Sequence, residues 1–192
     1  MKKILAFFLF AALGMAAWAQ DKDFKPFGIK SGYMKTVTMK GKEKLCDNYL
    51  WFDDFGRKEK GVTTTYMGAD MGSFDVTTIF LDGQCWMISD DGEVKELEGR
   101  PELRFDKLSD QEKKNLKFKD LGTEEYKGKL CNKYYYEQKQ LVKSRITVWV
   151  WKGIIIRQHI KQTFGETMIE LEELQENARV PASTFTVPKS KK

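Results

Sequence analysis

The sequence predicts a mainly β (α+β) fold, in which an antiparallel sheet of about ten strands is accompanied by one clear helix. Short stretches rich in Val, Ile, Thr and aromatic residues recur between turns that contain Gly or Asp, which is typical of antiparallel β structure. Only residues 109–118 leave this pattern. The 192 residues contain no internal repeat and no interdomain linker, so we expect a single folded domain.

The first half of the chain is expected to supply six strands joined by turns. The dipeptides Asp82-Gly83 and Asp91-Gly92 are each typical of a two-residue hairpin turn. Asp54-Phe55-Gly56 matches the kinase metal-binding triplet, but the other kinase motifs are absent, so we interpret it as a turn. The expected strands cover residues 29–39, 45–52, 57–66, 74–81, 84–89 and 93–97.

The helix predicted between the two groups of strands carries its own start signal. Ser109 followed by Glu112 forms a capping box, and Leu108, Leu116 and Phe118 can form a narrow apolar stripe. The strands expected after it are a hairpin at 124–138 and single strands at 145–151, 153–163 and 167–174.

The N-terminal residues predict export. A short basic start is followed by an apolar run at residues 4–12 and by Ala17-Trp18-Ala19, which has the small residues of a signal-peptidase site. We expect a signal peptide at 1–19, cleaved after Ala19, and a periplasmic domain at 20–192. No cysteine lies near the cut, so we expect no lipid anchor, and no later stretch is long and apolar enough to span a membrane as a helix.

The composition excludes one class of partner. Loss of the two leader lysines lowers the formal charge from +5 to +3, and the charged residues are interspersed along the chain. Nucleic-acid-binding proteins usually concentrate Lys and Arg on one face, so we expect no nucleic acid partner. Aromatic residues make up 13% at a mean hydropathy of −0.53, which indicates a water-soluble chain with a large apolar interior.

Three cysteines remain after cleavage, namely Cys46, Cys85 and Cys131. An exported chain enters an oxidising compartment, so we expect one disulfide among these three and one thiol left over. The sequence leaves the pairing open. No C-x-x-C motif is present, which removes the basis for a thioredoxin-like redox role.

No arrangement of reactive residues indicates an enzyme. His159 is the only histidine, so a zinc site of several His and Cys ligands is not expected. Cys131 and His159 lack the local signature of a cysteine nucleophile. The paired aspartates at 53–54 and 90–91 fall in predicted turns, where aspartate caps its own backbone. We therefore expect no catalytic residues, no metal and no cofactor.

One strand pair is apolar on both faces. Ile146, Val148 and Val150 are expected to point one way, and Trp149 and Trp151 the other. Two interpretations remain open: central strands packed on both sides, or a curved sheet whose concave side holds an apolar ligand. We slightly favour the ligand, because one helix is little cover for a large sheet.

Four segments resemble a known family: "SGYMKTVTMKG", "LWFDDFGRKEK", "GTEEYKGKLCNKYYYE" and the closing "ARVPASTFTVP". Together they look like the periplasmic lipoprotein-carrier superfamily (LolA and LolB type), and especially its DUF4412 relatives from Bacteroidetes. The ending with Pro181, Phe185 and Pro188 is similar to the proline–phenylalanine ending of those carriers. The resemblance implies an unclosed half-barrel with one or two helices over an apolar concave face that accepts acyl chains. Only residues 20–28 precede the first strand, so the leading helix typical of the carriers is short or missing.

From these observations we expect a non-enzymatic periplasmic binding or carrier protein whose partner is a lipid or an acylated protein. The alternative is an envelope interaction module that has a solid core and binds a protein partner through exposed tryptophans. The side chains expected to line a ligand cavity are Phe80, Trp86, Ile88, Val148, Val150, Ile154 and Ile156.

Overall fold

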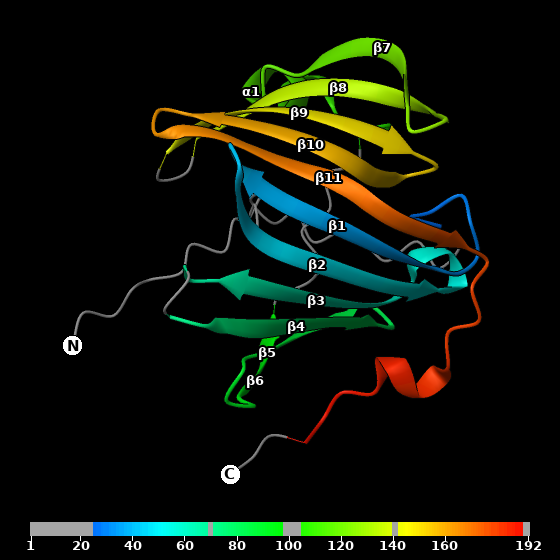
Figure 1. Ribbon diagram of the computed structural model, residues 1–192. Helices are drawn as coiled ribbons and strands as arrows, with labels where there is room; N and C mark the ends of the chain where they lie inside the picture. The colour runs from blue at the N-terminus through cyan, green and yellow to red at the C-terminus, as the bar shows by residue number, and fades with distance from the viewer. Residues whose placement is uncertain (1–24, 69–70, 98–104, 140–141, 190–192) are drawn as a thin grey trace.

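A computed structural model describes residues 25–68, 71–97, 105–139 and 142–189. These residues form one curved antiparallel sheet of eleven strands in the order β6-β5-β4-β3-β2-β1-β11-β10-β9-β8-β7 (Figure 1). The two ends of this order, β6 and β7, do not pair with each other, so the sheet is unclosed. The predicted mainly β, unclosed antiparallel architecture is confirmed.

The elements follow the chain in a nearly continuous meander. The strands are β1 (Gly32–Lys40), β2 (Glu43–Asp53), β3 (Lys58–Tyr66), β4 (Ser73–Leu81), β5 (Gln84–Ile88), β6 (Val94–Leu97), β7 (Lys119–Tyr126), β8 (Lys129–Lys139), β9 (Lys143–Trp151), β10 (Ile154–Gln162) and β11 (Gly165–Glu176). The helical elements are η1 (Asp54–Gly56), α1 (Asp110–Asn115) and η2 (Ala182–Phe185). The meander is interrupted once, between β6 and β7, which lie at opposite ends of the sheet order, and β11 then pairs with β1.

The predicted helix exists as α1, and its capping box is formed. The Ser109 side chain accepts a hydrogen bond from the Glu112 amide, and the Glu112 carboxylate accepts one from the Ser109 amide. The helix is six residues long and none of its own residues is buried. Its apolar contacts come from the flanking Leu108 and Leu116, as the sequence predicted.

One of the two predicted Asp-Gly hairpins is confirmed and the other is wrong. Asp82 and Gly83 both have positive φ, as a tight two-residue turn requires. At the second site the Gly92 amide donates to the Ser89 carbonyl and the Ser89 amide to the Glu93 carbonyl, so the loop between Ser89 and Glu93 holds three residues. Asp91 has no positive φ there, because its carboxylate instead accepts hydrogen bonds from the Ser89 hydroxyl and the Glu93 amide.

The two faces of the sheet can be followed from strand to strand by the register. Val148 pairs with Gln158, Gln158 with Ile169, and Ile169 with Thr38. The same face continues through Cys46 and Thr65 to Phe74. Since α1 and its flanking residues pack on Val148 and its neighbours, we call this the α1 face, and we call the other the Trp149 face.

The α1 face carries one of the two apolar clusters of the molecule. We call it the α1 cluster. Its buried members are Leu108, Leu116, Tyr136, Ile146, Val148, Val150 and Ile160, and Phe105, Phe118, Tyr134 and Ile169 pack against them half-buried. These side chains come from the α1 segment and from β8, β9, β10 and β11.

The second apolar cluster lies where β10 and β11 diverge. β10 begins at Ile154, but its pairing with β11 begins only at Arg157. Side chains from the Trp149 face of β8–β10 there meet side chains from the α1 face of β1, β2 and β11. We call this the wedge cluster; its buried members are Phe27, Ile29, Met34, Phe52, Cys131, Trp149, Ile154, Ile156 and Leu171.

The predicted signal peptide at 1–19 lies outside the described residues. Within the described part of the chain, no helix is long and apolar enough to cross a membrane.

Candidate ligand-binding site

Three aromatic rings of the α1 cluster lie close together. The Phe105 ring lies 5.0 Å from the Tyr134 ring and 6.3 Å from the Phe118 ring, and Phe118 lies 5.4 Å from Tyr134. Beneath them Val148 is fully buried. Phe105 and Phe118 lie on either side of α1 in the sequence, so the helix is held on the sheet by rings at both of its ends.

Polar contacts hold the C-terminal side of this helix on β8. The Glu137 amide of β8 donates to the Leu116 carbonyl at 2.6 Å, and the Lys117 amine lies 2.9 Å from the Glu137 carboxylate. Hydrogen bonds from Lys117, Lys143 and Tyr135 lower the pKa of Glu137 to about 2. The segment ahead of the helix reaches the sheet through the Phe105 ring, which packs on Tyr134 and Tyr136.

The seven side chains predicted to line a cavity do not share one surface. Phe80 pairs with Cys85 on the α1 face, the face that also carries Val148 and Val150. Trp86 and Ile88 alternate with Cys85 along β5, so they lie on the Trp149 face. The structure therefore groups Phe80, Val148 and Val150 by face and separates Trp86 and Ile88 from them.

Ile154 and Ile156 belong to the wedge cluster instead. Ile154 pairs with Trp151 across the Lys152-Gly153 turn, and the register shift between Ile155 and Arg157 turns Ile156 toward the same cluster. The predicted turn at Lys152-Gly153 is confirmed, since both residues have positive φ. The apolar residues of β9 and β10 thus contribute to two clusters on opposite faces.

On the Trp149 face, two cationic side chains lie against the ring of Trp149, which belongs to the wedge cluster. The Lys133 amine lies 4.8 Å and the Arg157 guanidinium 4.6 Å from the centroid of the Trp149 ring. The indole N–H of Trp149 donates to Glu124 at 2.9 Å. Hydrogen bonds from Lys133 and Trp149 hold the pKa of Glu124 below its usual value. These charges are mutually compensated, which favours a structural role for this group of side chains.

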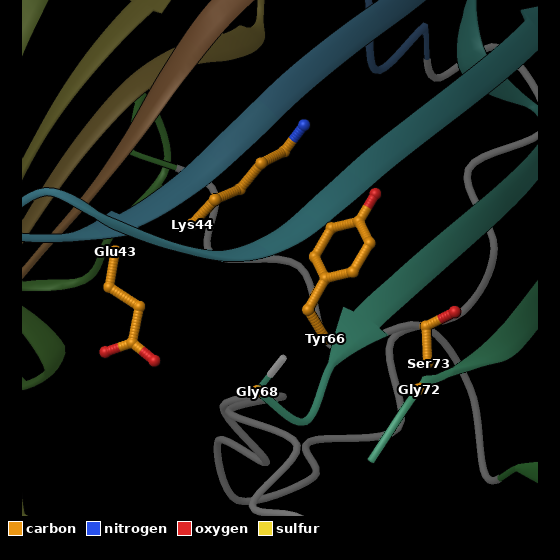
Figure 2. Close-up of a pocket in the computed structure, with 6 residues that line it drawn as sticks. All are labelled: Glu43, Lys44, Tyr66, Gly68, Gly72 and Ser73. Atoms are coloured by element: carbon orange, nitrogen blue, oxygen red, sulfur yellow. The ribbon is translucent and has the colours of Figure 1, made fainter. Parts of the chain in front are cut away.

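A shallow polar hollow lies at the ends of β2, β3 and β4, lined by Glu43, Lys44, Tyr66, Gly68, Gly72 and Ser73. Figure 2 shows the Lys44 amine and the Tyr66 hydroxyl pointing to the same side, away from Glu43. Both groups contact the buried Asp47, at 2.7 Å and 2.5 Å. Burial alone would raise the pKa of Asp47, but the hydrogen bonds from Lys44 and Tyr66 lower it below its usual value. The Lys44 amine and the Tyr66 hydroxyl are thus engaged with Asp47.

The expected disulfide is absent, because Cys46, Cys85 and Cys131 are all free thiols. They lie on β2, β5 and β8, and no two of these strands are neighbours in the sheet. Neighbouring strands lie about 4.8 Å apart, so β2 and β5 are separated by about 14 Å, which exceeds the Cα separation that a disulfide can bridge.

Cys131 and His159, the residues considered for nucleophilic catalysis, contact other groups. Burial raises the pKa of the Cys131 thiol, which donates to the Lys129 carbonyl. His159 contacts Glu166 at 2.8 Å. No group of three His, Cys, Asp or Glu side chains suited to a metal ion occurs in the described ranges.

Sequence reasoning missed Phe27 and Phe105, and it placed Ile29 in the first strand. Phe27 and Ile29 lie ahead of the first strand and fill the wedge cluster. The apolar alternation at 27 and 29 was a signal for them, but it merges with the pattern of β1. Phe105 was missed because its partners Phe118 and Tyr134 are distant in the sequence.

Comparisons with known proteins show a shared fold and no family. No family model matches the chain, and no curated protein matches it. An uncharacterized conserved protein from Thermus thermophilus matches with a TM-score of 0.51 at 7% identity, over 83% of this chain and 86% of that one. This match shows that the two proteins share a fold.

Other solved structures match with TM-scores below 0.5. A chain of the Pseudomonas aeruginosa MucA/MucB complex has a TM-score of 0.48 at 10% identity, over 82% of this chain and 56% of that one. This chain therefore spans little more than half of that protein's length. The Mycobacterium tuberculosis lipoprotein LppX has a TM-score of 0.41 at 16% identity, over 80% of this chain and 90% of that one.

Proposed function

We propose that this protein is a non-enzymatic periplasmic carrier that binds a lipid or the acyl chain of a lipoprotein on its α1 face. In this proposal it is a DUF4412-like member, from Bacteroidetes, of the lipoprotein-carrier superfamily, exported and cleaved after Ala19 without a lipid anchor. The observation that supports the proposal is an open eleven-stranded sheet with only one α-helix among the described residues. That helix is six residues long and contributes no buried residue of its own.

The α1 face has apolar side chains well beyond the area beneath the helix. Besides Val148 and Val150 in the α1 cluster, Val76, Phe80 and Met87 lie on the same face at β4 and β5. An acyl chain laid from one group to the other would gain about 0.8 kcal/mol for each buried CH₂. Outward movement of the α1 segment would expose the Val148 end of this path.

Binding of a fluorescent fatty acid of sixteen carbons to the exported, processed protein tests the proposal. Phe80 is half-buried on the α1 face, so we expect Phe80→Asp to weaken binding by more than tenfold, because a carboxylate loses its hydration against an acyl chain. Ile88→Asp is the matched control. Ile88 is also half-buried on the adjacent strand, but it lies on the Trp149 face, so its variant should bind as the unchanged protein does.

Two results would contradict the carrier function. One is absence of saturable probe binding by the unchanged protein, combined with native mass spectrometry that finds no co-purified lipid. The other is equal weakening by Phe80→Asp and Ile88→Asp, which would assign the effect to general destabilisation.

One observation favours the alternative of an envelope interaction module. Val148 and Ile156 are fully buried by the protein's own side chains, as they would be in a solid core. Recovery of one stoichiometric protein partner from envelope extracts, without lipid, would support this second function.

A further inference from the structure

Three neighbouring hairpins place their turns at the same end of the sheet. β2, β1, β11, β10, β9 and β8 are consecutive in the sheet order, so the β1–β2, β10–β11 and β8–β9 turns form a row (Figure 1). We call the described residues of this row the hairpin-tip surface. Its exposed side chains include six cations or apolar groups, Lys40, Lys42, Lys139, Lys143, Lys161 and Phe164, and two carboxylates, Glu43 and Glu166.

The central turn of this row exposes a phenyl ring. Phe164 is 77% exposed, the highest value among the large hydrophobic residues that the structure describes. It occupies a two-residue turn between the paired Gln162 and Gly165. Such turns favour Gly, Asn, Asp and Pro, so the turn itself does not call for phenylalanine. The fold therefore gives no reason for a ring at this position.

Lysine side chains lie on both sides of the ring. A Cβ placed on Gly165 would lie 3.4 Å from Cε of Lys40, so the Lys40 side chain reaches the β10–β11 turn. Lys42 lies in the β1–β2 turn. On the other side of β10, Lys139 is the last residue of β8 and Lys143 is the first residue of β9. Phe164 thus protrudes between two groups of flexible cations.

The positive charge of this surface is only partly neutralised. Lys161 contacts Glu166 at 3.1 Å and Lys143 contacts Glu137 at 3.1 Å. Lys40, Lys42 and Lys139 have no ion pair within the described part of the chain. An apolar tip flanked by uncompensated cations complements a layer that is apolar inside and anionic at its surface.

We propose that the hairpin-tip surface docks on an anionic lipid bilayer, with Phe164 in the interfacial region and the lysines at the headgroup phosphates. A protein partner fits these observations less well, because protein hot spots are usually surrounded by well-packed neighbours that exclude water. Phe164 instead stands alone on a turn. The proposal does not depend on a cargo in the α1 face, so the two can fail separately.

Co-sedimentation with phosphatidylcholine vesicles, with and without about 30% phosphatidylglycerol, tests the proposal. The probe protein is the exported, processed chain, with its N-terminus verified by mass spectrometry. We expect binding only to the anionic vesicles, and weaker binding at high salt. Phe164→Ala should weaken it about tenfold. Lys40→Glu with Lys42→Glu should weaken it roughly fivefold or more for each lysine.

Matched controls lie far from the hairpin-tip surface. Leu130 is 69% exposed near the β7–β8 turn, at the other end of β8, so Leu130→Ala should leave vesicle binding unchanged. The exposed Lys30 and Lys189, changed together to Glu, control for the loss of net positive charge. Circular dichroism and melting temperature establish that each variant is folded.

Three outcomes would overturn the proposal. The unchanged protein fails to bind anionic vesicles, the hairpin-tip variants bind as well as the controls do, or both sets weaken binding equally. A fourth would reassign the surface to a protein partner: the hairpin-tip variants lose an acidic protein while vesicle binding persists.

Discussion

The wedge cluster and the α1 cluster use the same two strands, β9 and β10, but they are closed in different ways. The wedge cluster is closed by residues 25–31 ahead of β1, which we call the lead segment. The Phe27 amide donates to the Phe55 carbonyl, and the Gly28 amide donates to the Lys152 carbonyl. The α1 cluster is closed by a six-residue helix whose C-terminal side is anchored by a backbone hydrogen bond from the Glu137 amide to the Leu116 carbonyl. A cluster closed by backbone hydrogen bonds is expected to be rigid, whereas one closed by half-buried rings can open locally.

The largest expected effect compares the same truncation in the two clusters. Phe52 is fully buried, and its ring lies 5.0 Å from Phe27 in an edge-to-face arrangement. Phe52→Ala should lower the free energy of unfolding by about 3–5 kcal/mol. Phe118→Ala removes a half-buried ring of the α1 cluster and should cost less than about half of that. Urea denaturation at neutral pH measures both values.

Equal costs for these two truncations would remove the distinction between a rigid and an openable cluster. A sharper result would come from hydrogen exchange of the backbone amides. Phe118→Ala is expected to increase exchange in α1 alone, whereas Phe52→Ala should increase it in β1, β2 and β10 together.

A smaller effect is expected from the turn that holds the lead segment. Gly153 has a φ of +81°, and a Cβ there would lie 2.2 Å from the Pro26 carbonyl oxygen. Gly128 occupies the corresponding position of the β7–β8 turn at a φ of +71°, with nothing within 4 Å. Gly128→Ala should therefore cost about 1–2 kcal/mol for the left-handed backbone alone. Gly153→Ala should cost at least about 1 kcal/mol more, because Pro26 must move.

Thermal and urea unfolding of the two alanine variants provide the comparison. If Gly153→Ala and Gly128→Ala are equally destabilised, the lead segment does not hold the wedge cluster closed.

The strand pattern was readable from the sequence because most of it is local. Alternation of apolar residues, the Asp82-Gly83 and Lys152-Gly153 turns and the capping box at Ser109 each depend on neighbouring residues. β7 was harder, since Lys119–Tyr126 is an edge strand whose residues are mostly exposed and carry little apolar alternation. The predicted two-residue turn at Asp91-Gly92 was wrong, because the Asp91 carboxylate accepts a hydrogen bond from the Glu93 amide that competes with the geometry of such a turn.

The distribution of the predicted cavity residues could not be read from the sequence. Whether Trp86 and Phe80 share a face depends on strand register, and whether Ile156 joins Val148 depends on one extra residue in β10. The sequence did indicate that β9 and β10 are apolar on both faces. It could not indicate that the second face is filled by Phe27 and Ile29, because that contact joins residues far apart in the chain.

The smallest expected effect concerns the ion pairs of Glu137, the β8 residue whose amide anchors the C-terminal side of α1. Glu137 has a pKa lowered to about 2 by hydrogen bonds from Lys117, Lys143 and Tyr135, below the ordinary glutamate value. A lowered carboxyl pKa stabilises the fold at pH values above the unfolded-state pKa of about 4.3, and that contribution is lost as the pH falls toward 2.

Glu137→Gln should therefore lower the urea midpoint at pH 6, and its difference from the unchanged protein should shrink continuously down to pH 2. Glu125→Gln, on exposed β7 and without an ion pair among the described residues, is the control and should show no such convergence. If the Glu137→Gln difference stays constant with pH, the ion pairs do not hold the helix, and the rings of Phe105 and Phe118 alone close the α1 cluster.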